Sequence, residues 1–244
     1  MSKERYFGLA VEALRRIEST EAEAIDAAAS LCAEAIAGDH LVFTFGTGHS
    51  SLLASEGLFR AGGLACVSAM LESPVTFEPG GVASSFFERS RGYAPLLLAR
   101  YGASAGDVLV VFSNSGVNAL PVEVAIEART LGVQVVGVVS RAYADQAPRT
   151  ASGGESLAEI ADVVIDNHVP PGDAVVPFYG DAVRAASLST LSGAFIWNAI
   201  VAEVVSLLEK EGIKAPVFVS SNMPNAKDTN EALVAKYRTR VRHL

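Results

Sequence analysis

Short apolar runs that alternate with helix-length segments are the feature that most constrains the fold of this chain. The runs are rich in Val, Leu and Phe and lack polar alternation, which is typical of strands buried on both faces. Strands that alternate with helices form right-handed βαβ units and a parallel sheet. We therefore expect an α/β fold with a parallel sheet sandwiched by helices and strands at 41–45, 64–68, 108–112, 133–139 and 161–165.

Helices are expected between these strands and before the first of them. Apolar periodicity predicts them at 49–61, 93–101 and 117–131, after a helical N-terminal segment from 4 to 37. Ser19-Thr20 with Glu23 resembles a capping box, which would divide the N-terminal segment into two helices.

A long late helix is expected from Ala185 to Lys210, and it is apolar nearly all round between Leu188 and Val205. Such a helix is buried on most sides, by its own sheet or by a second subunit. We assign the chain to a single domain, 1–244, with N-terminal helices over 1–38, a core over 39–212 and a C-terminal extension over 213–244. Residues 1–9 are charged and lack an apolar stretch, so we do not expect them to be a signal peptide, and no apolar run reaches the length of about 18 residues that suggests a membrane span.

Charge and cysteine usage restrict the partners. The net charge is -8 without any basic block, whereas a nucleic-acid binder needs a basic face. An acidic protein can still bind a small anion in a positive pocket. Cys32 and Cys66 form no pairing motif, so we expect a reduced, cytoplasmic protein. The histidines and cysteines lack metal-ligand spacing, and we expect neither a metal nor another cofactor.

A glycine- and serine-rich loop follows the first expected strand: Gly46, Thr47, Gly48, His49, Ser50 and Ser51. Glycines permit a tight turn, and the following helix N-terminus offers N–H groups to an anion. His49 stands where a Walker A loop requires lysine, so that motif is rejected. A GxGxxG fingerprint is incomplete at Ser51, although Glu72 lies at a suitable distance for a ribose contact. Alone, the loop is equally consistent with a capped turn.

A second polar loop follows the third expected strand and favours a phosphate ligand. It contains Ser113, Asn114, Ser115, Gly116, Val117 and Asn118. Gly116 allows the backbone to form a concave nest of N–H donors, and the short side chains add further donors. A terminal phosphate has three oxygens and needs several donors at once, whereas a dinucleotide fold needs no second nest here.

The two loops resemble those of the SIS (sugar isomerase) domain family. Residues 113–118 look like its Ser-x-Ser-Gly-x-Thr/Ser/Asn phosphate loop, and residues 46–50 look like its loop after the first strand. The resemblance covers roughly residues 5–210. It is closest to a bacterial group of sugar isomerase domain-containing proteins related to phosphoheptose isomerases, which 166–176, 194–203 and 216–244 also resemble.

This resemblance implies a flavodoxin-like or Rossmann-like fold with a five-stranded parallel sheet. It also implies a sugar-phosphate ligand, aldose–ketose isomerisation, and a homodimer or homotetramer with sites at the subunit interface. The expected phosphate-binding residues are Gly46, Thr47, Gly48, Ser50, Ser51, Ser113, Asn114, Ser115, Gly116 and Asn118.

Aldose–ketose isomerisation needs a base for the carbon-bound proton and an acid for the oxygens. Glu56 and Glu72 are the carboxylate candidates and His49 is the candidate acid, while Glu88 follows Glu72 in the same irregular segment. Each glutamate could instead be a solvated surface charge. Phosphoheptose isomerases carry a histidine on their late helix that this chain lacks, and His168 is the hypothetical replacement.

Two alternative functions remain open at this point: a sugar-phosphate sensor without turnover, and a lyase or etherase acting on an amino-sugar phosphate. Direct DNA binding is not expected, because the segment before the first strand is too short and not basic enough for a helix-turn-helix domain. The tail arginines at 238, 240 and 242 form either a solvated end or a contact with a neighbouring subunit.

Overall fold

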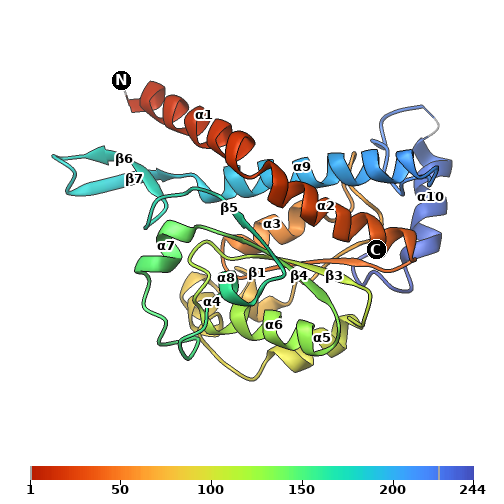
Figure 1. Cartoon of the computed structure of the whole chain (residues 1–244), viewed down its shortest axis with the longest axis horizontal. Coiled ribbons are helices and arrows are strands. Elements are labelled where there is room, and N and C mark those ends of the chain that lie inside the picture. The colour runs from red at the N-terminus through yellow and green to blue at the C-terminus, as the bar shows by residue number, and fades with distance from the viewer. Residues whose placement is uncertain (1, 225) are drawn as a thin grey trace.

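Five parallel strands form the central sheet, in the order β2-β1-β3-β4-β5. A computed structural model describes residues 2–224 and 226–244 of the chain (Figure 1). The strands are β1 (Val42–Gly46), β2 (Val67–Ala69), β3 (Val108–Phe112), β4 (Gln134–Val139) and β5 (Val163–Asp166). All five expected strands are confirmed, and their pairing is parallel throughout.

The strand order reverses between β1 and β3, because the chain adds β2 on one side of this pair and β4 and β5 on the other. Every residue of β1 and β3 is buried. In an open parallel sheet, such a switch point opens a crevice at the carboxyl ends of the two strands. The two polar loops follow these two strands.

Helices cover both faces of the sheet (Figure 1). On one face lie α2 (Ala22–Ala37), α3 (Ser50–Glu56) and α9 (Ser189–Lys210), and on the other lie α4 (Gly81–Phe87), α5 (Ala94–Tyr101), α6 (Ala119–Thr130) and α8 (Leu157–Ile160). Trp197 of α9 is 2% exposed, and its ring meets that of Phe112 in β3 edge to face with the centroids 6.3 Å apart. This contact fixes α9 against the centre of the sheet.

The N-terminal segment is two helices, α1 (Ser2–Thr20) and α2, as the sequence suggested. The expected capping box does not form. The Thr20 hydroxyl donates to the Arg16 carbonyl one turn earlier, at 2.8 Å, and Glu21 occupies the N-cap position of α2 without a capping side-chain bond.

The long helix begins at Ser189, so the prediction that it starts at Ala185 is wrong. Residues 183–187 form β7 (Val183–Ser187), which pairs antiparallel with β6 (Ala174–Phe178). The hairpin packs against α1. The contact is a small apolar cluster that is separate from the main core: Ala10, Val169, Val175, Val176 and Leu188. The alanines at 185 and 186 favour a helix by propensity, but the pairing with β6 overrides that preference.

α9 is the one helix in the described part of the chain with the length and hydropathy of a membrane span, at a mean hydropathy of 1.7. Core helices meet the same criteria, and Ile196, Trp197 and Ile200 place one side of α9 in the core. Leu191 and Phe195 remain 40% and 39% exposed, so the helix also has an apolar outer face.

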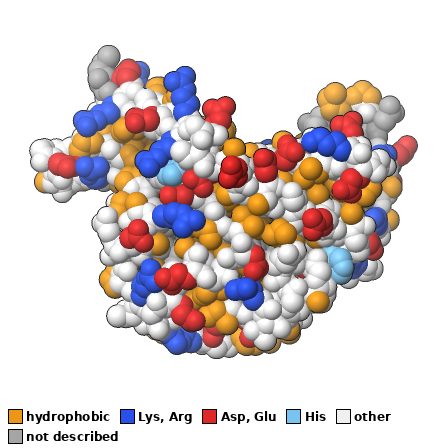
Figure 2. Space-filling model, viewed as in Figure 1, with side chains coloured by type: hydrophobic (Ala, Val, Ile, Leu, Met, Phe, Trp, Pro, Cys, Tyr) orange, Lys and Arg blue, Asp and Glu red, His pale blue; other side chains and the backbone are white. Residues whose placement is uncertain are grey.

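The last helix is α10 (Ala226–Tyr237). Tyr237 and Val241 are buried and anchor this segment against the core. Figure 2 shows Lys and Arg side chains interspersed with Asp and Glu on one face of the molecule, without a continuous basic field on that face.

Candidate functional site

A polar cavity of about 350 Å³ lies at the carboxyl ends of β1 and β3. Both polar loops line it, together with α4, α7 (Arg141–Gln146) and the base of the β6–β7 hairpin. The residues expected from the sequence that border it are Thr47, Gly48, His49, Ser50, Ser113, Asn114, Ser115 and Asn118.

The loop after β1 turns sharply at Gly46. A Cβ atom at this position would lie 2.4 Å from the Ser50 carbonyl oxygen, so only glycine fits. Gly48 has a φ of 54°, in the left-handed region, and its N–H donates to the Val75 carbonyl at 2.9 Å. Ser51 is buried and donates to the Gly48 carbonyl at 2.7 Å. Gly46 and Ser51 therefore determine the conformation of this loop and do not border the cavity.

Two hydrogen bonds at Gly116 hold the loop after β3 in its conformation. The Gly116 N–H donates to the Ser113 hydroxyl oxygen at 3.3 Å, and the Gly116 carbonyl accepts from the Leu157 N–H at 2.8 Å. Gly116 has a φ of 65° and does not border the cavity. Asn118 is the N-cap of α6, so the amino end of that helix begins at the cavity.

Three hydroxyls in this cavity have no hydrogen-bond partner among the residues that the structure describes: those of Ser50, Ser115 and Tyr143. Asn114 differs, because its side-chain oxygen accepts from the Asn167 amide at 2.9 Å. The unpaired hydroxyls of Ser50 and Ser115, one from each loop, are available to a ligand together with that of Tyr143 on α7.

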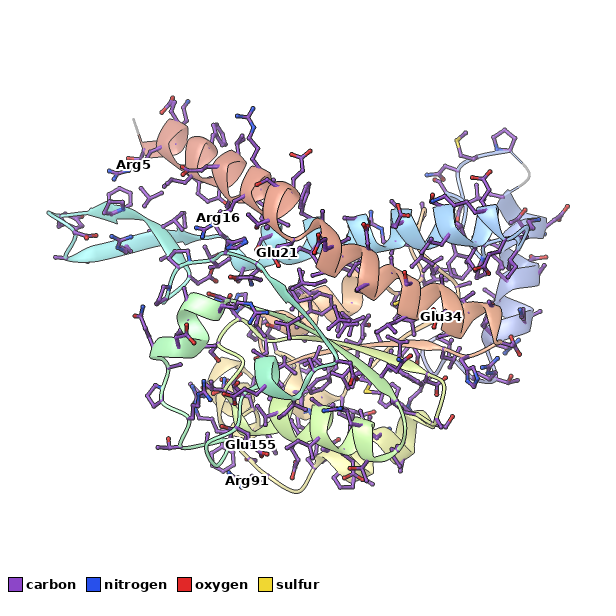
Figure 3. All side chains as sticks on the ribbon, in the orientation of Figure 1. Arg5, Arg16, Glu21, Glu34, Arg91 and Glu155 are labelled. Carbon is purple, nitrogen blue, oxygen red and sulfur yellow. The ribbon has the colours of Figure 1, made fainter. Side chains whose placement is uncertain are left out.

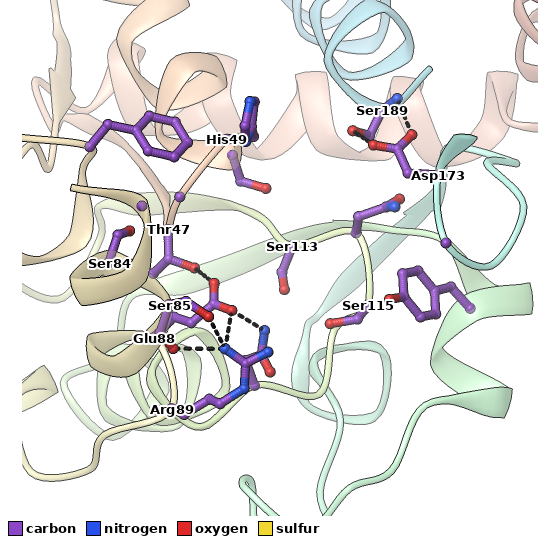
Figure 4. A pocket seen from close by; sticks show the side chains of 18 residues that line it. Thr47, His49, Ser84, Ser85, Glu88, Arg89, Ser113, Ser115, Asp173 and Ser189 are labelled. Carbon is purple, nitrogen blue, oxygen red and sulfur yellow. Dashed lines mark hydrogen bonds and ion pairs between the residues drawn. The ribbon is translucent and has the colours of Figure 1, made fainter. Parts of the chain in front are cut away.

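Glu88 joins the two loops from the end of α4. One carboxylate oxygen accepts from the Thr47 hydroxyl at 3.1 Å. The other accepts from the Asn118 amide at 3.1 Å and from the Arg89 guanidinium at 2.9 Å. Arg89 also donates to the carbonyl and hydroxyl oxygens of Ser85, at 2.7 and 2.6 Å. Figure 4 shows this network on one side of the cavity.

Asp173 lies on the other side, at the base of the hairpin (Figure 4). One of its oxygens accepts from the backbone N–H groups of Leu188 and Ser189, at 2.9 and 2.8 Å. The other accepts from the Ser189 hydroxyl at 2.6 Å. Asp173 therefore caps α9 from a different segment of the chain.

His49 is exposed at the rim of the cavity, where its ring packs edge-on against Phe77 with the centroids 4.6 Å apart. It is the one catalytic candidate expected from the sequence that the structure places at this cavity. The other three, Glu56, Glu72 and His168, do not border it.

The Glu56 carboxylate pairs with Arg60 and accepts from the Asn198 amide at 3.3 Å. It is the last residue of α3, so at about 1.5 Å per residue it lies roughly 9 Å along the helix from Ser50. Glu72 accepts from Arg100 Nε at 2.7 Å, on the outer side of β2.

His168 lies at the end of β5, between two carboxylates. Its Nε2 is 2.9 Å from Glu21 Oε1, and its Nδ1 is 3.3 Å from Asp166 Oδ2. Figure 3 shows Glu21 at the junction of α1 and α2. His168 thus connects the N-terminal helices to the sheet edge, outside the cavity.

The sequence interpretation did not assign site roles to Glu88, Arg89, Ser84 and Ser85. Glu88, the C-cap of α4, follows Ser84 by four residues and Ser85 by three, so all three lie on one side of the helix. This spacing was the signal available in the sequence. The predicted helices did not include this seven-residue helix. Asp173 was included only in the stretch 166–176, without a role of its own.

The described residues contain no group of three His, Cys, Asp or Glu side chains placed to hold a metal ion. Cys32 and Cys66 are buried, and burial raises the pKa of each thiol to about 12. Neither thiol is poised to act as a thiolate nucleophile or ligand.

A comparison with protein-family models identifies the SIS domain family. The model of the SIS domain matches residues 5–140. A UPF0309 protein of Brucella canis is 43% identical over 241 residues, which cover 99% of this chain and 98% of that protein.

Two solved structures share the fold. The phosphoheptose isomerase of Neisseria gonorrhoeae has a TM-score of 0.51 and 19% identity, over 84% of this chain and 100% of that chain. The sugar isomerase domain of an RpiR transcription factor from Sphaerobacter thermophilus has a TM-score of 0.52 and 16% identity, over 97% of this chain and 98% of that chain.

Proposed function

Because the chain belongs to the SIS domain family, we propose that it binds a sugar phosphate in the cavity at the ends of β1 and β3. The observation that carries this proposal is the meeting of the two polar loops around one cavity, each with an unpaired hydroxyl, Ser50 and Ser115. The loop closed by Ser113 and Gly116 and the amino end of α6 supply donors and a partial positive charge for a phosphate.

Arg89 is the one lysine or arginine among the described residues that line this cavity. Its guanidinium pairs with the Glu88 carboxylate. Their charges balance, and the second carboxylate of the lining, Asp173, is held by the N–H groups of Leu188 and Ser189 on the other side of the cavity. The two loops themselves present neutral donors to the incoming phosphate. Arg89 is half-exposed and can turn one of its remaining N–H groups toward that phosphate.

We further propose that the protein isomerises its ligand between aldose and ketose, with Glu88 as the base. In this step the carboxylate takes the proton from the carbon next to the carbonyl and returns it to the carbonyl carbon. His49 protonates the carbonyl oxygen and then accepts the proton that the adjacent hydroxyl gives up, so both Glu88 and His49 end in their starting protonation states. Such acid–base catalysis contributes roughly 100- to 10,000-fold to a rate.

A proton-exchange assay in D2O tests this function. The protein is incubated with pentose, hexose and heptose phosphates, with N-acetylated amino-sugar phosphates, and with the matching free sugars. The proposal predicts deuterium incorporation next to the carbonyl of one phosphorylated class, and none with the free sugar. A sugar phosphate that binds without exchange or conversion in any class would contradict the isomerase proposal.

The three donors on the Glu88 carboxylate favour a second candidate function, a sugar-phosphate sensor without turnover. Thr47, Asn118 and Arg89 together hold the carboxylate as a bridge between the loops. In a sensor, Glu88→Gln would weaken ligand binding or loop order and no reaction would be detectable. In an isomerase, the same substitution removes turnover while binding persists.

A further inference from the structure

A second cavity lies at the opposite ends of the strands, beside the amino ends of β1 and β3. Its volume is about 560 Å³, which exceeds that of the first cavity. Three segments line it: His40 and Leu41 before β1, the residues from the end of α5 to Asp107, and Thr239–Arg242 of the tail. Figure 1 shows the C-terminus at the end of the molecule opposite the hairpin.

The tail is fixed in this position. Val241 is fully buried, and its N–H donates to the Tyr237 carbonyl at 2.8 Å. Arg240 pairs with the Asp39 carboxylate at 3.2 Å and donates to the Asp39 carbonyl at 2.5 Å. Two of the three tail arginines, Arg240 and Arg242, therefore line this cavity, whereas the exposed Arg238 lies outside it.

Three arginines converge on this cavity: Arg100 from α5, and Arg240 and Arg242 from the tail. Arg100 and Arg242 share the Glu72 carboxylate, at 2.7 and 3.9 Å from their Nε atoms. The terminal nitrogens of both guanidinium groups have no partner among the described residues. Arg242 is also held against the Tyr101 ring, 5.8 Å from its centroid.

The charges around the cavity leave an excess of cations. Lys236 lies 3.5 Å from Asp39, which Arg240 also contacts, so Asp39 and Glu72 together face four cationic side chains. Asp107 is buried in the wall, where its oxygens accept from the backbone N–H groups of Leu41 and Ser104, at 2.8 and 2.9 Å. These N–H groups stabilise its charge locally.

We propose that this cavity binds a small phosphorylated anion at a site separate from the sugar-phosphate cavity. The planar guanidinium fork matches two phosphate oxygens at once, and the free ends of Arg100 and Arg242 provide two such forks. The volume lies in the range of about 300–1,000 Å³ that is typical of small-molecule sites. The ligand would tie the C-terminal tail to α5. This proposal does not depend on the function of the first cavity.

Pyrophosphate is the probe for the test, and calorimetry measures its binding. The experiment uses a Ser113→Ala/Ser115→Ala variant, so that the first cavity does not contribute. We expect one pyrophosphate per chain. Arg242→Met and Arg100→Met should each raise the dissociation constant at least tenfold in this background, while Arg238→Met, on the same tail as Arg242 but outside the cavity, should leave it unchanged.

Three outcomes would overturn the proposal. One is the absence of pyrophosphate binding in the Ser113→Ala/Ser115→Ala background. Another is an equal loss of affinity in Arg238→Met, which would indicate unspecific attraction to a basic tail. The third is citrate binding as tightly as pyrophosphate, which would remove the preference for phosphate.

Hydrogen–deuterium exchange of the unmodified protein provides a second measurement that does not require any variant to fold. Pyrophosphate should slow amide exchange in 96–104 and 237–243. Protection confined to the loops at 46–51 and 113–118 would assign the anion to the first cavity and contradict a second site.

Discussion

The hydroxyl of Thr47 donates to the carboxylate of Glu88 at 3.1 Å and joins two residues that lie 41 positions apart in the sequence. The same carboxylate accepts from Asn118, so one side chain connects the loop after β1, the end of α4 and the start of α6. Glu88 is 17% exposed and faces the cavity. The chemistry proposed for this site depends on that position.

Glu88→Gln should reduce turnover of the substrate by roughly 100- to 10,000-fold, because an amide cannot accept the carbon-bound proton. Its effect on the dissociation constant should be small, since glutamine keeps the size of the side chain and one acceptor for Thr47. Turnover by NMR and binding by calorimetry check this. Glu78→Gln, an exposed glutamate before α4, is the matched control. Unchanged turnover in Glu88→Gln would exclude Glu88 as the base.

Ser115→Ala should weaken binding of the sugar phosphate about tenfold or more without a loss of fold stability. The Ser115 hydroxyl has no partner among the described residues, so its removal breaks no bond within the chain. A hydrogen bond to a charged group contributes about 1.5–3 kcal/mol.

Ser51→Ala provides the contrast, because that hydroxyl is buried and bonded to the Gly48 carbonyl. Its main effect should be on the free energy of unfolding, by about 1 kcal/mol. Equal phosphate affinity in Ser115→Ala and the wild type would argue against Ser115 as a phosphate ligand.

Asp173→Ala should destabilise the protein by about 1–2 kcal/mol, because it removes the acceptor for two backbone N–H groups at the start of α9. For a chain of this size the midpoint of thermal unfolding should fall by roughly 2–4 °C per kcal/mol. Asp181→Ala is the control, since Asp181 is exposed at the hairpin and pairs with Arg184 alone. An equal fall of the midpoint in both variants would contradict the capping role.

His243 should make the fold less stable in mild acid. Desolvation, followed by the positive charge of Arg242, lowers the pKa of His243 below its ordinary value of 6.5. The folded state therefore favours the neutral ring, which is 2.9 Å from the Tyr101 hydroxyl through Nε2. This contribution is complete above about pH 6.5 and is lost as the pH falls through the pKa of the folded state.

Denaturant unfolding of wild type and His243→Gln between pH 7 and pH 5 measures the effect. The free energy of unfolding of the wild type should fall more steeply than that of the variant toward pH 5. Parallel curves would show that His243 does not contribute.

The sheet and the two loops could be predicted because local sequence determines them. The runs that form β1 and β3 are buried on both faces and are therefore apolar without alternation, and the glycines at 46, 48 and 116 mark turns that only glycine makes easily. Both signals are contained within a few residues.

The structure differs from the sequence-based expectations where tertiary contacts decide the outcome. β7 contains two alanines and was expected to begin the late helix, but its pairing with β6 makes it a strand. Glu56, Glu72 and His168 were the candidates outside the loops, and Glu88 was noted beside Glu72 without a role. Only the packing of α4 against the two loops distinguishes Glu88, and it depends on contacts between distant segments. His168 instead faces Glu21, 147 positions away.

The most direct test of the central claim is a calorimetric titration that compares wild type with Ser113→Ala/Ser115→Ala. Each protein is titrated with the sugar phosphate that the exchange assay identifies and with the same sugar without its phosphate. We predict that wild type binds the sugar phosphate at least 100-fold more tightly than the free sugar and that the double variant loses most of this preference. A double variant that keeps the full preference would contradict the assignment of the phosphate to this loop.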